Sequence, residues 1–163
     1  MPRLAVIQIH KEELKFSAGH FMIITHEHRE TMHGHDYQVQ VAFKALILHN
    51  GMAFDCRIYK KKLLELCQLI DYHFILPAHS SYLQLTETAS QCIAKIGEDT
   101  FPFYKKDCII LPICNVTIEE LSNWFLQQLL QNTQELAEHQ IQEITVTVFN
   151  GRGESGSTHW SAI

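Results

Sequence analysis

The sequence predicts one α+β domain whose strands and helices form separate layers. Residues 35–49 and 143–150 alternate apolar and polar side chains with the two-residue period of a strand. Residues 57–70 have the apolar spacing of an amphipathic helix, and residues 115–136 begin with a capping-box spacing at 117–120. With 163 residues, 46% of them hydrophobic, the chain fits one compact domain with one core.

The first half of the chain is expected to fold as strand, turn, strand and helix. Residues 4–19 are interpreted as a strand or a bent strand pair, and Asn50-Gly51 supplies a turn after the strand at 35–49. We expect these strands to pair antiparallel. In the helix at 57–70, the apolar side chains that gather near one face are Ile58, Leu63, Leu66, Cys67 and Ile70.

The second half is less regular. Residues 77–112 are interpreted as a hairpin, with one strand at 91–96 that turns through residues 97–99. The segment at 143–150 is the last predicted strand. The predicted order is therefore two strands, a helix, a hairpin, a helix and a strand.

Composition argues against several classes of partner. Acidic residues number 18 and Lys plus Arg 13, without the basic block that nucleic-acid binding requires, so we expect no nucleic-acid partner. The five cysteines follow no C-x-x-C spacing, which favours a reducing compartment. The N-terminus lacks the apolar core of a signal peptide, and no apolar run approaches membrane-spanning length. These features predict a cytoplasmic protein without a membrane partner.

Histidine is the unusual residue type, with 11 copies in the chain. His33 and His35 are two apart at the start of a predicted strand, so they point the same way, roughly 7 Å apart. His20 ends the preceding strand and reaches the same face if the two strands pair antiparallel. Three imidazoles with an open fourth position are typical of catalytic zinc. A polar strand edge is the alternative for the histidine pair taken alone.

Several short motifs extend this pattern. The segment 16-FSAGH-20 followed by 33-HGH-35 resembles the 6-pyruvoyl-tetrahydropterin synthase family, which includes the bacterial 6-carboxytetrahydropterin synthases. The segments 72-YHFIL-76, 116-VTIEE-120 and 146-VTVFN-150 stand where that family has its D-H-x-x-L, T-x-E and closing-strand motifs. The resemblance spans most of the chain.

The resemblance implies a T-fold, an antiparallel sheet with two helices on one face. Residues 1–163 would form a single such domain, with the hairpin at 77–112 as an insertion. It further implies a lyase acting on the small pterin 7,8-dihydroneopterin triphosphate, with Zn²⁺ held by His20, His33 and His35. Family members close into oligomeric barrels, typically hexamers with shared active sites. The open edges and bare face of such a sheet also favour a homo-oligomer.

One departure from the family concerns the catalytic base. No cysteine precedes Cys56, whereas relatives that make pyruvoyl- or carboxy-pterins have one shortly before H-G-H. Glu30 gives E-x-x-H-G-H, which resembles the branch that cleaves the side chain to leave 6-hydroxymethyl-dihydropterin. A carboxylate can take the proton that a thiolate would take. Glu30 is therefore the candidate base, and a solvated loop acid is the alternative.

A second departure lies after the first helix. His73 keeps the position of the family's catalytic histidine, but Tyr72 stands where the family has the aspartate that supports it. Asp71 could supply that carboxylate only if the backbone turns there, and Tyr72 could itself donate a hydrogen bond or carry a proton. The alternative for His73 is a helix C-terminal cap.

A third departure concerns substrate binding. Asn150 stands where the family has the glutamate that binds the pterin ring, and an amide accepts two donors less well than a carboxylate. Glu154 and Glu119 are candidate replacements, and Thr117 is a further candidate. Each has a structural alternative: a tail acid for Glu154, a first-turn acid for Glu119 and a helix cap for Thr117.

These departures leave two functions open. One is the zinc-dependent lyase, acting by proton abstraction and carbon–carbon cleavage. The other is a zinc-containing T-fold protein that binds a pterin- or purine-like ligand without turnover. The position of Glu30 and His73 relative to the zinc site is the feature that separates them.

Overall fold

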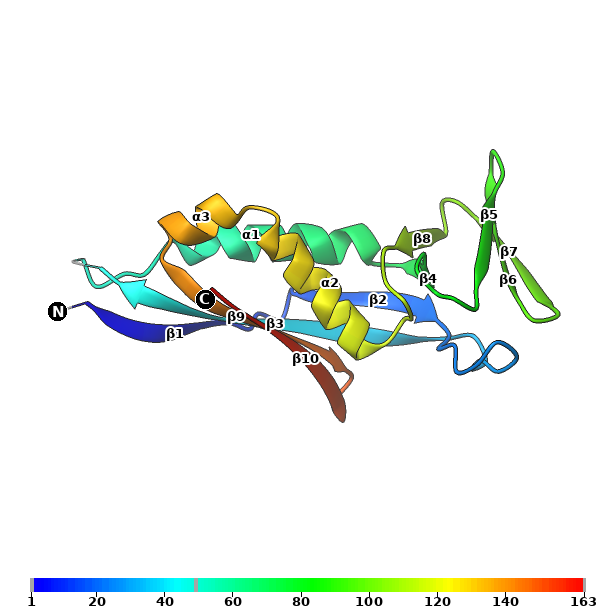
Figure 1. The fold of residues 1–163 in the computed structure, drawn as a ribbon, viewed down its shortest axis with the longest axis horizontal. Coiled ribbons are helices and arrows are strands. Elements are labelled where there is room, and N and C mark those ends of the chain that lie inside the picture. The colour runs from blue at the N-terminus through cyan, green and yellow to red at the C-terminus, as the bar shows by residue number, and fades with distance from the viewer. Residues whose placement is uncertain (1, 49, 163) are drawn as a thin grey trace.

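A long, curved sheet forms the body of the protein, and helices cover one of its faces (Figure 1). The computed structural model describes residues 2–48 and 50–162, so the last residue of the predicted strand at 35–49 lies outside the described part. The strand order is β10-β9-β3-β2-β4-β8, with β1 also paired to β3. Within the described residues, no helix is both long and apolar enough to cross a membrane.

The predicted bent strand pair is present at the N-terminus. β1 (Arg3–Ile9) and β2 (Lys15–His20) lie end to end along the long β3 (His33–Ile47), and both pair with it antiparallel. Between them, the N–H of Leu14 donates to the carbonyl of Lys11 (3.0 Å), and the buried Leu14 side chain holds the bend against the core. The predicted antiparallel pairing of these strands is confirmed.

The sheet is mixed, whereas the resemblance described above implied an antiparallel one. β4 (His73–Pro77) pairs parallel to β2, and β8 (Cys108–Leu111) pairs parallel to β4. The cause is α1 (Cys56–Ile70), which carries the chain back along the sheet, so the strand that follows runs in the direction of β2.

The hairpin predicted over residues 77–112 is a larger structure. Three strands form a separate antiparallel sheet at one end of the molecule (Figure 1), and the chain then returns to the main sheet as β8. The strand at 91–96 and its turn are confirmed. The strands of this small sheet are β5 (Gln84–Glu87), β6 (Gln91–Ile96) and β7 (Asp99–Tyr104).

The second helix is shorter than predicted. α2 (Ile118–Leu130) has Thr117 as its N-cap, whose Oγ1 accepts the N–H of Glu120 at 3.3 Å, as the capping box predicted. The predicted continuation breaks at Asn132, whose Oδ1 accepts the N–H of Glu135 at 3.1 Å and so caps a new helix. That helix is α3 (Thr133–Glu138).

The C-terminal part contains one more strand than predicted. β9 (Ile141–Asn150) and β10 (Glu154–Ser161) form an antiparallel hairpin, with Gly151 at φ 62° in the turn. The predicted strand at 143–150 is confirmed, and β10 corrects the interpretation of Glu154 as part of a tail.

The main core lies between the sheet and the helices. Alternate residues of β3 point toward the helices and are fully or almost fully buried, as are alternate residues of β9. In α1 the buried face consists of Tyr59, Leu63, Cys67 and Ile70. A second apolar cluster lies beneath the small sheet and includes Phe21, Ile23, Leu76, Ala94 and Ile96. The site described next lies where β2 ends and β3 begins.

Candidate active site

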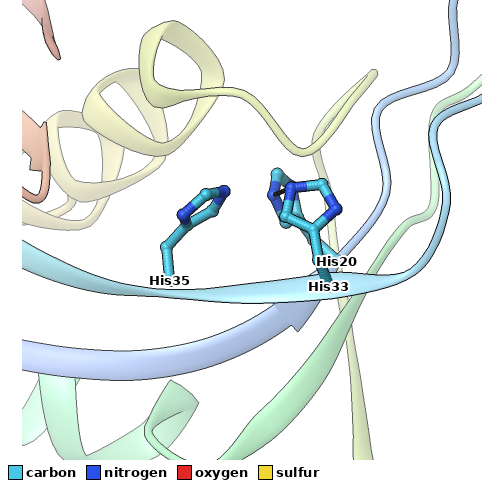
Figure 2. A group of neighbouring side chains, drawn as sticks. All are labelled: His20, His33 and His35. Atoms are coloured by element: carbon cyan, nitrogen blue, oxygen red, sulfur yellow. Dashed lines mark hydrogen bonds between the residues drawn. The ribbon is translucent and has the colours of Figure 1, made fainter.

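Three histidines meet where β2 and β3 pair. His20 lies opposite His33 in the register of the two strands, and His35 follows on the same face of β3. One ligating atom from each of the three side chains lies within 4.8 Å of the other two. The closest pair is Nε2 of His20 and Nε2 of His33, 3.2 Å apart (Figure 2). The three histidines that the sequence selected therefore lie together in the structure.

Two of these rings are oriented by backbone carbonyls. Nδ1 of His20 lies 2.9 Å from the carbonyl oxygen of Val116, and Nδ1 of His33 lies 2.7 Å from that of Thr31. Because a carbonyl only accepts, each Nδ1 must carry the proton, which leaves each Nε2 lone pair free. Metal-binding histidines are commonly held in this way by a partner behind the ring.

Electrostatics favour the neutral form of His20. The side chain is 4% exposed, and this burial lowers its pKa below the ordinary histidine value. The Val116 carbonyl opposes that change, and the neighbouring His33 and His35 add to it. A neutral imidazole is the form that binds metal. Three imidazole nitrogens, one from a buried side chain and two from more accessible ones, suit Zn²⁺ that keeps a fourth coordination position open.

The three histidines line a cavity of about 830 Å³. This cavity brings together most of the residues that the sequence proposed for the site, from segments far apart in the chain. Besides the three histidines, those residues are Glu30, Thr117, Glu119, Asn150 and Glu154.

The candidate base, Glu30, lies beside the histidines. Its Oε2 is 3.8 Å from Nε2 of His33 and accepts a hydrogen bond from the N–H of Met22 at 3.1 Å. The Glu30 side chain is 29% exposed, so it is not a freely solvated loop acid. The carboxylate and the three histidines line the same cavity.

The candidate pterin-binding residues lie across the cavity. Asn150 ends β9, directly opposite Tyr37 of β3 and Glu154 of β10. Glu119 is in the first turn of α2, where Thr117 caps the helix. Two carboxylates and one amide therefore line the same cavity as the histidines, and the amide of Asn150 does not have to bind a ligand alone.

Tyr37 is a lining residue that the sequence interpretation missed. It is two residues after His35, so the alternation that selected His33 and His35 also points Tyr37 into this face. Burial raises the pKa of the Tyr37 phenol, and the nearby Glu30 carboxylate acts in the same direction. The hydroxyl therefore stays protonated and can donate a hydrogen bond. The other lining residues that were missed are Met22, Val116, Ile118, Gly153 and Ser155.

His73, Tyr72 and Asp71 do not line the cavity of the three histidines. Tyr72 and His73 line a second cavity of about 400 Å³, and His35 lines both cavities. The chain does turn at Tyr72, which has φ 58° and an exposed fraction of 85%.

The carboxylate of Asp71 does not support His73. Its Oδ1 accepts the N–H of Ser17 at 2.8 Å, and Nδ1 of His73 instead lies 2.8 Å from the backbone carbonyl of Asp71. The imidazole therefore has a fixed tautomer with a free Nε2, but within one chain His73 does not line the cavity that contains Glu30 and all three histidines.

The family follows from a comparison with known proteins. The family model for 6-pyruvoyl tetrahydropterin synthase matches residues 8–157. This chain belongs to the 6-pyruvoyl tetrahydropterin synthase family. Family members are enzymes that act on pterins.

Solved structures of 6-pyruvoyl tetrahydropterin synthases have the same fold. The Plasmodium vivax crystal structure shares 27% identity, covers 98% of this chain and 99% of its own, and has a TM-score of 0.92. The Plasmodium falciparum structure gives 26% identity, the same coverages and a TM-score of 0.91. These similarities confirm the predicted α+β T-fold.

Two further comparisons bear on function. Structures of two Plasmodium vivax variants, in which a glutamate described as a catalytic residue is replaced by alanine or cysteine, each match with a TM-score of 0.92. A Methanocaldococcus jannaschii protein with the provisional name 6-carboxy-5,6,7,8-tetrahydropterin synthase is 26% identical over 142 residues, 86% of each chain.

Proposed function

We propose that this protein is a zinc-dependent lyase that cleaves the side chain of 7,8-dihydroneopterin triphosphate to leave 6-hydroxymethyl-7,8-dihydropterin. The observation that carries the proposal is the position of Glu30, whose carboxylate is 3.8 Å from Nε2 of His33 in the cavity of the three histidines. The Plasmodium vivax relative, with a glutamate described as catalytic, supports a carboxylate in this role.

The metal of this proposal is Zn²⁺, held by His20, His33 and His35. When bound, it would polarise a side-chain hydroxyl of the substrate and make its proton easier to remove. The support for zinc is the set of three nitrogen ligands and the backbone carbonyls that orient two of them.

Glu30 would act as the base. Its carboxylate takes the proton of the hydroxyl on the second side-chain carbon, and that oxygen becomes an aldehyde carbonyl as the bond between the first and second carbons breaks. The electron pair of the broken bond enters the C6=N5 group of the pterin ring. The first carbon then takes up a proton, so the reaction needs no oxidant or reductant.

The pterin ring would bind at the opposite side of the cavity. Its ring N–H and amino group are donors, and the carboxylates of Glu119 and Glu154 are acceptors that line that side. The amide oxygen of Asn150 is a third acceptor. The protonated hydroxyl of Tyr37 provides a donor between the ring site and the histidines.

The complete site would be shared between copies of the chain in a homo-oligomer, which by family resemblance is a hexamer. The support is twofold. Within its own chain, His73 shares a cavity with His35 but does not line the cavity that contains Glu30 and all three histidines, and the helices of the described residues lie on one face of the sheet (Figure 1). On the other face, β1 exposes Leu4 (46%) and Val6 (61%), apolar side chains that a second copy would bury. The free Nε2 of His73 would then serve the site of a neighbouring copy.

The test is incubation of zinc-loaded protein with 7,8-dihydroneopterin triphosphate, followed by identification of the product by mass. We expect 6-hydroxymethyl-7,8-dihydropterin and the two-carbon aldehyde that carries the triphosphate. A pyruvoyl or carboxy product would overturn the proposed cleavage reaction but would still show that the protein is an enzyme acting on this pterin. Tight binding of the pterin without any product would favour the ligand-binding alternative.

A further inference from the structure

The loop that carries Glu30 is held in place by its neighbour, Arg29. Residues 21–32 join β2 to β3, and they present Glu30 to the histidines. The Arg29 side chain is 20% exposed, which is low for an arginine on a connecting loop. Its guanidinium group does not enter the cavity. It instead contacts both the small sheet and the backbone of Glu30.

Arg29 connects the loop to the turn between β6 and β7. Nε and one terminal nitrogen of Arg29 donate to Oδ2 of Asp99, at 3.0 and 2.8 Å. The guanidinium carbon also lies 4.4 Å from the centre of the Phe101 ring and 5.4 Å from that of Phe21. A paired arginine stacked on aromatic rings is held in one geometry, which a lysine cannot reproduce.

The same guanidinium group holds the backbone of Glu30. Its other terminal nitrogen donates to the Glu30 carbonyl at 2.7 Å, while the Glu30 N–H donates to the Met22 carbonyl at 2.9 Å. Both backbone groups of Glu30 therefore have fixed partners. An isolated antiparallel β-bridge between Ile23 and Arg29 also joins the two sides of the loop.

We propose that Arg29 is a positioning residue for Glu30, with Asp99 and Phe101 of the small sheet as its support. This inference rests on the proposed role of Glu30 as the base. The three-stranded sheet would then have a function in the reaction, because its residues Asp99 and Phe101 hold Arg29 and, through Arg29, the loop that carries Glu30. Placement matters because a displacement of about 1 Å at a reacting group can slow a reaction ~10²-fold.

The first experiment compares Arg29→Ala with Arg29→Lys. We expect Arg29→Ala to lower kcat by about ten-fold or more with a smaller change in KM, since the base is displaced but the lining of the cavity is kept. Arg29→Lys should recover only part of the loss. Zinc content should stay at the wild-type value in both, because the three histidines lie on β2 and β3.

A matched control is Arg57→Ala. Arg57 also pairs with an aspartate, Asp55, whose Oδ2 is 2.7 Å away, but its side chain is 89% exposed and lies at the start of α1, outside the cavity. Its loss should leave kcat unchanged. An equal fall in kcat for Arg57→Ala and Arg29→Ala would mean that loss of any arginine pair slows the enzyme, and would overturn the proposal.

A double-mutant cycle separates positioning from a general effect on the fold. If Arg29 acts through Glu30, then Arg29→Ala should change the residual single-turnover rate of Glu30→Gln by less than about two-fold. An equal loss in both backgrounds would overturn the proposal. Wild-type activity of Glu30→Gln would overturn the base itself, and with it the catalytic consequence of Arg29.

Amide hydrogen exchange gives a readout that does not depend on activity. In Arg29→Ala, exchange should become faster across residues 21–32 and at the turn between β6 and β7, while α1 and β9 keep wild-type protection. Unchanged exchange in residues 21–32 would show that Arg29 does not hold the loop. If exchange in residues 21–32 is faster in Arg29→Ala but Glu30→Gln is active, Arg29 holds the loop and only the role of Glu30 as the base is rejected.

Discussion

At the scale of single residues, the geometry of the histidine cluster depends on the backbone carbonyls that lie behind two of its rings. His20 is buried, and its Nδ1 is bound to the Val116 carbonyl, so only Nε2 faces the cavity. Val116 directly precedes the capping residue of α2, which links the orientation of this ring to the start of the helix. The backbone therefore fixes the orientation of two of the three rings, those of His20 and His33.

Loss of one ring should abolish metal binding. His20→Ala and His33→Ala should each lose Zn²⁺, because two imidazoles and water hold the ion much less well than three imidazoles. Elemental analysis of dialysed protein measures this directly. His26→Ala is the control, since that side chain is 73% exposed and is not in the cluster. Zinc at wild-type stoichiometry in both site variants would contradict the assignment.

The carboxylate of Glu30 should matter for chemistry and not for metal. We expect Glu30→Gln to slow the chemical step by about 10²- to 10⁴-fold, because the amide keeps the shape but cannot accept the proton. Pre-steady-state kinetics on zinc-loaded protein measure this step. Glu27→Gln is the matched control, since the Glu27 side chain is 79% exposed. If Glu27→Gln were slow and Glu30→Gln normal, the base would be Glu27.

At the scale of elements, the cavity depends on how β10 crosses the start of α2. Gly156 of β10 packs against the helix so closely that a Cβ there would lie 2.9 Å from the backbone nitrogen of Glu119. This close approach brings Glu154 and Glu119 into one cavity. Any side chain at position 156 would push the strand and the helix apart.

The Gly156 contact predicts a cost in stability. Gly156→Ala should lower the free energy of unfolding by about 1–3 kcal/mol, because the backbone atoms it meets cannot move as a side chain would. Urea denaturation measures the change. Gly153→Ala is the control, since a Cβ at Gly153 meets nothing within 4 Å. Equal stability of Gly156→Ala and wild type would show that the strand and helix can separate freely.

The same elements explain what the sequence could and could not predict. β3 and β9 bury one face, so their alternation was clear, and it also selected His33 and His35. β10 was missed because the side chains on its inner face are Gly156, Thr158 and Trp160, too mixed to show alternation. The parallel strands were missed because a short apolar run carries no information about its partner or its direction.

At the scale of the whole molecule, a single chain does not bring His73 into the cavity that contains Glu30 and all three histidines. Its imidazole is oriented by the Asp71 carbonyl, and it shares a cavity with His35 but not with His20, His33 or Glu30. Sequence motifs grouped His73 with the site because they report family membership and not distance within one copy. An assembly of copies would resolve this difference.

Mixed assemblies should recover activity. His33→Ala and His73→Ala should each be inactive alone, but co-assembled subunits should regain part of the activity, since some sites then combine an intact metal site with an intact His73 from another copy. Sedimentation at micromolar concentration should show an oligomer. A monomer that keeps zinc and activity would contradict the shared site, as would mixtures that stay inactive.

The most direct test of the central claim is turnover of 7,8-dihydroneopterin triphosphate in deuterium oxide, compared between zinc-loaded protein, zinc-free protein and zinc-loaded Glu30→Gln. We expect zinc-loaded protein to release 6-hydroxymethyl-7,8-dihydropterin with one deuterium on the hydroxymethyl carbon, since that carbon takes up a solvent proton after the bond breaks. The other two samples should release none over the same time. Equal product from zinc-free protein or from Glu30→Gln would contradict the account.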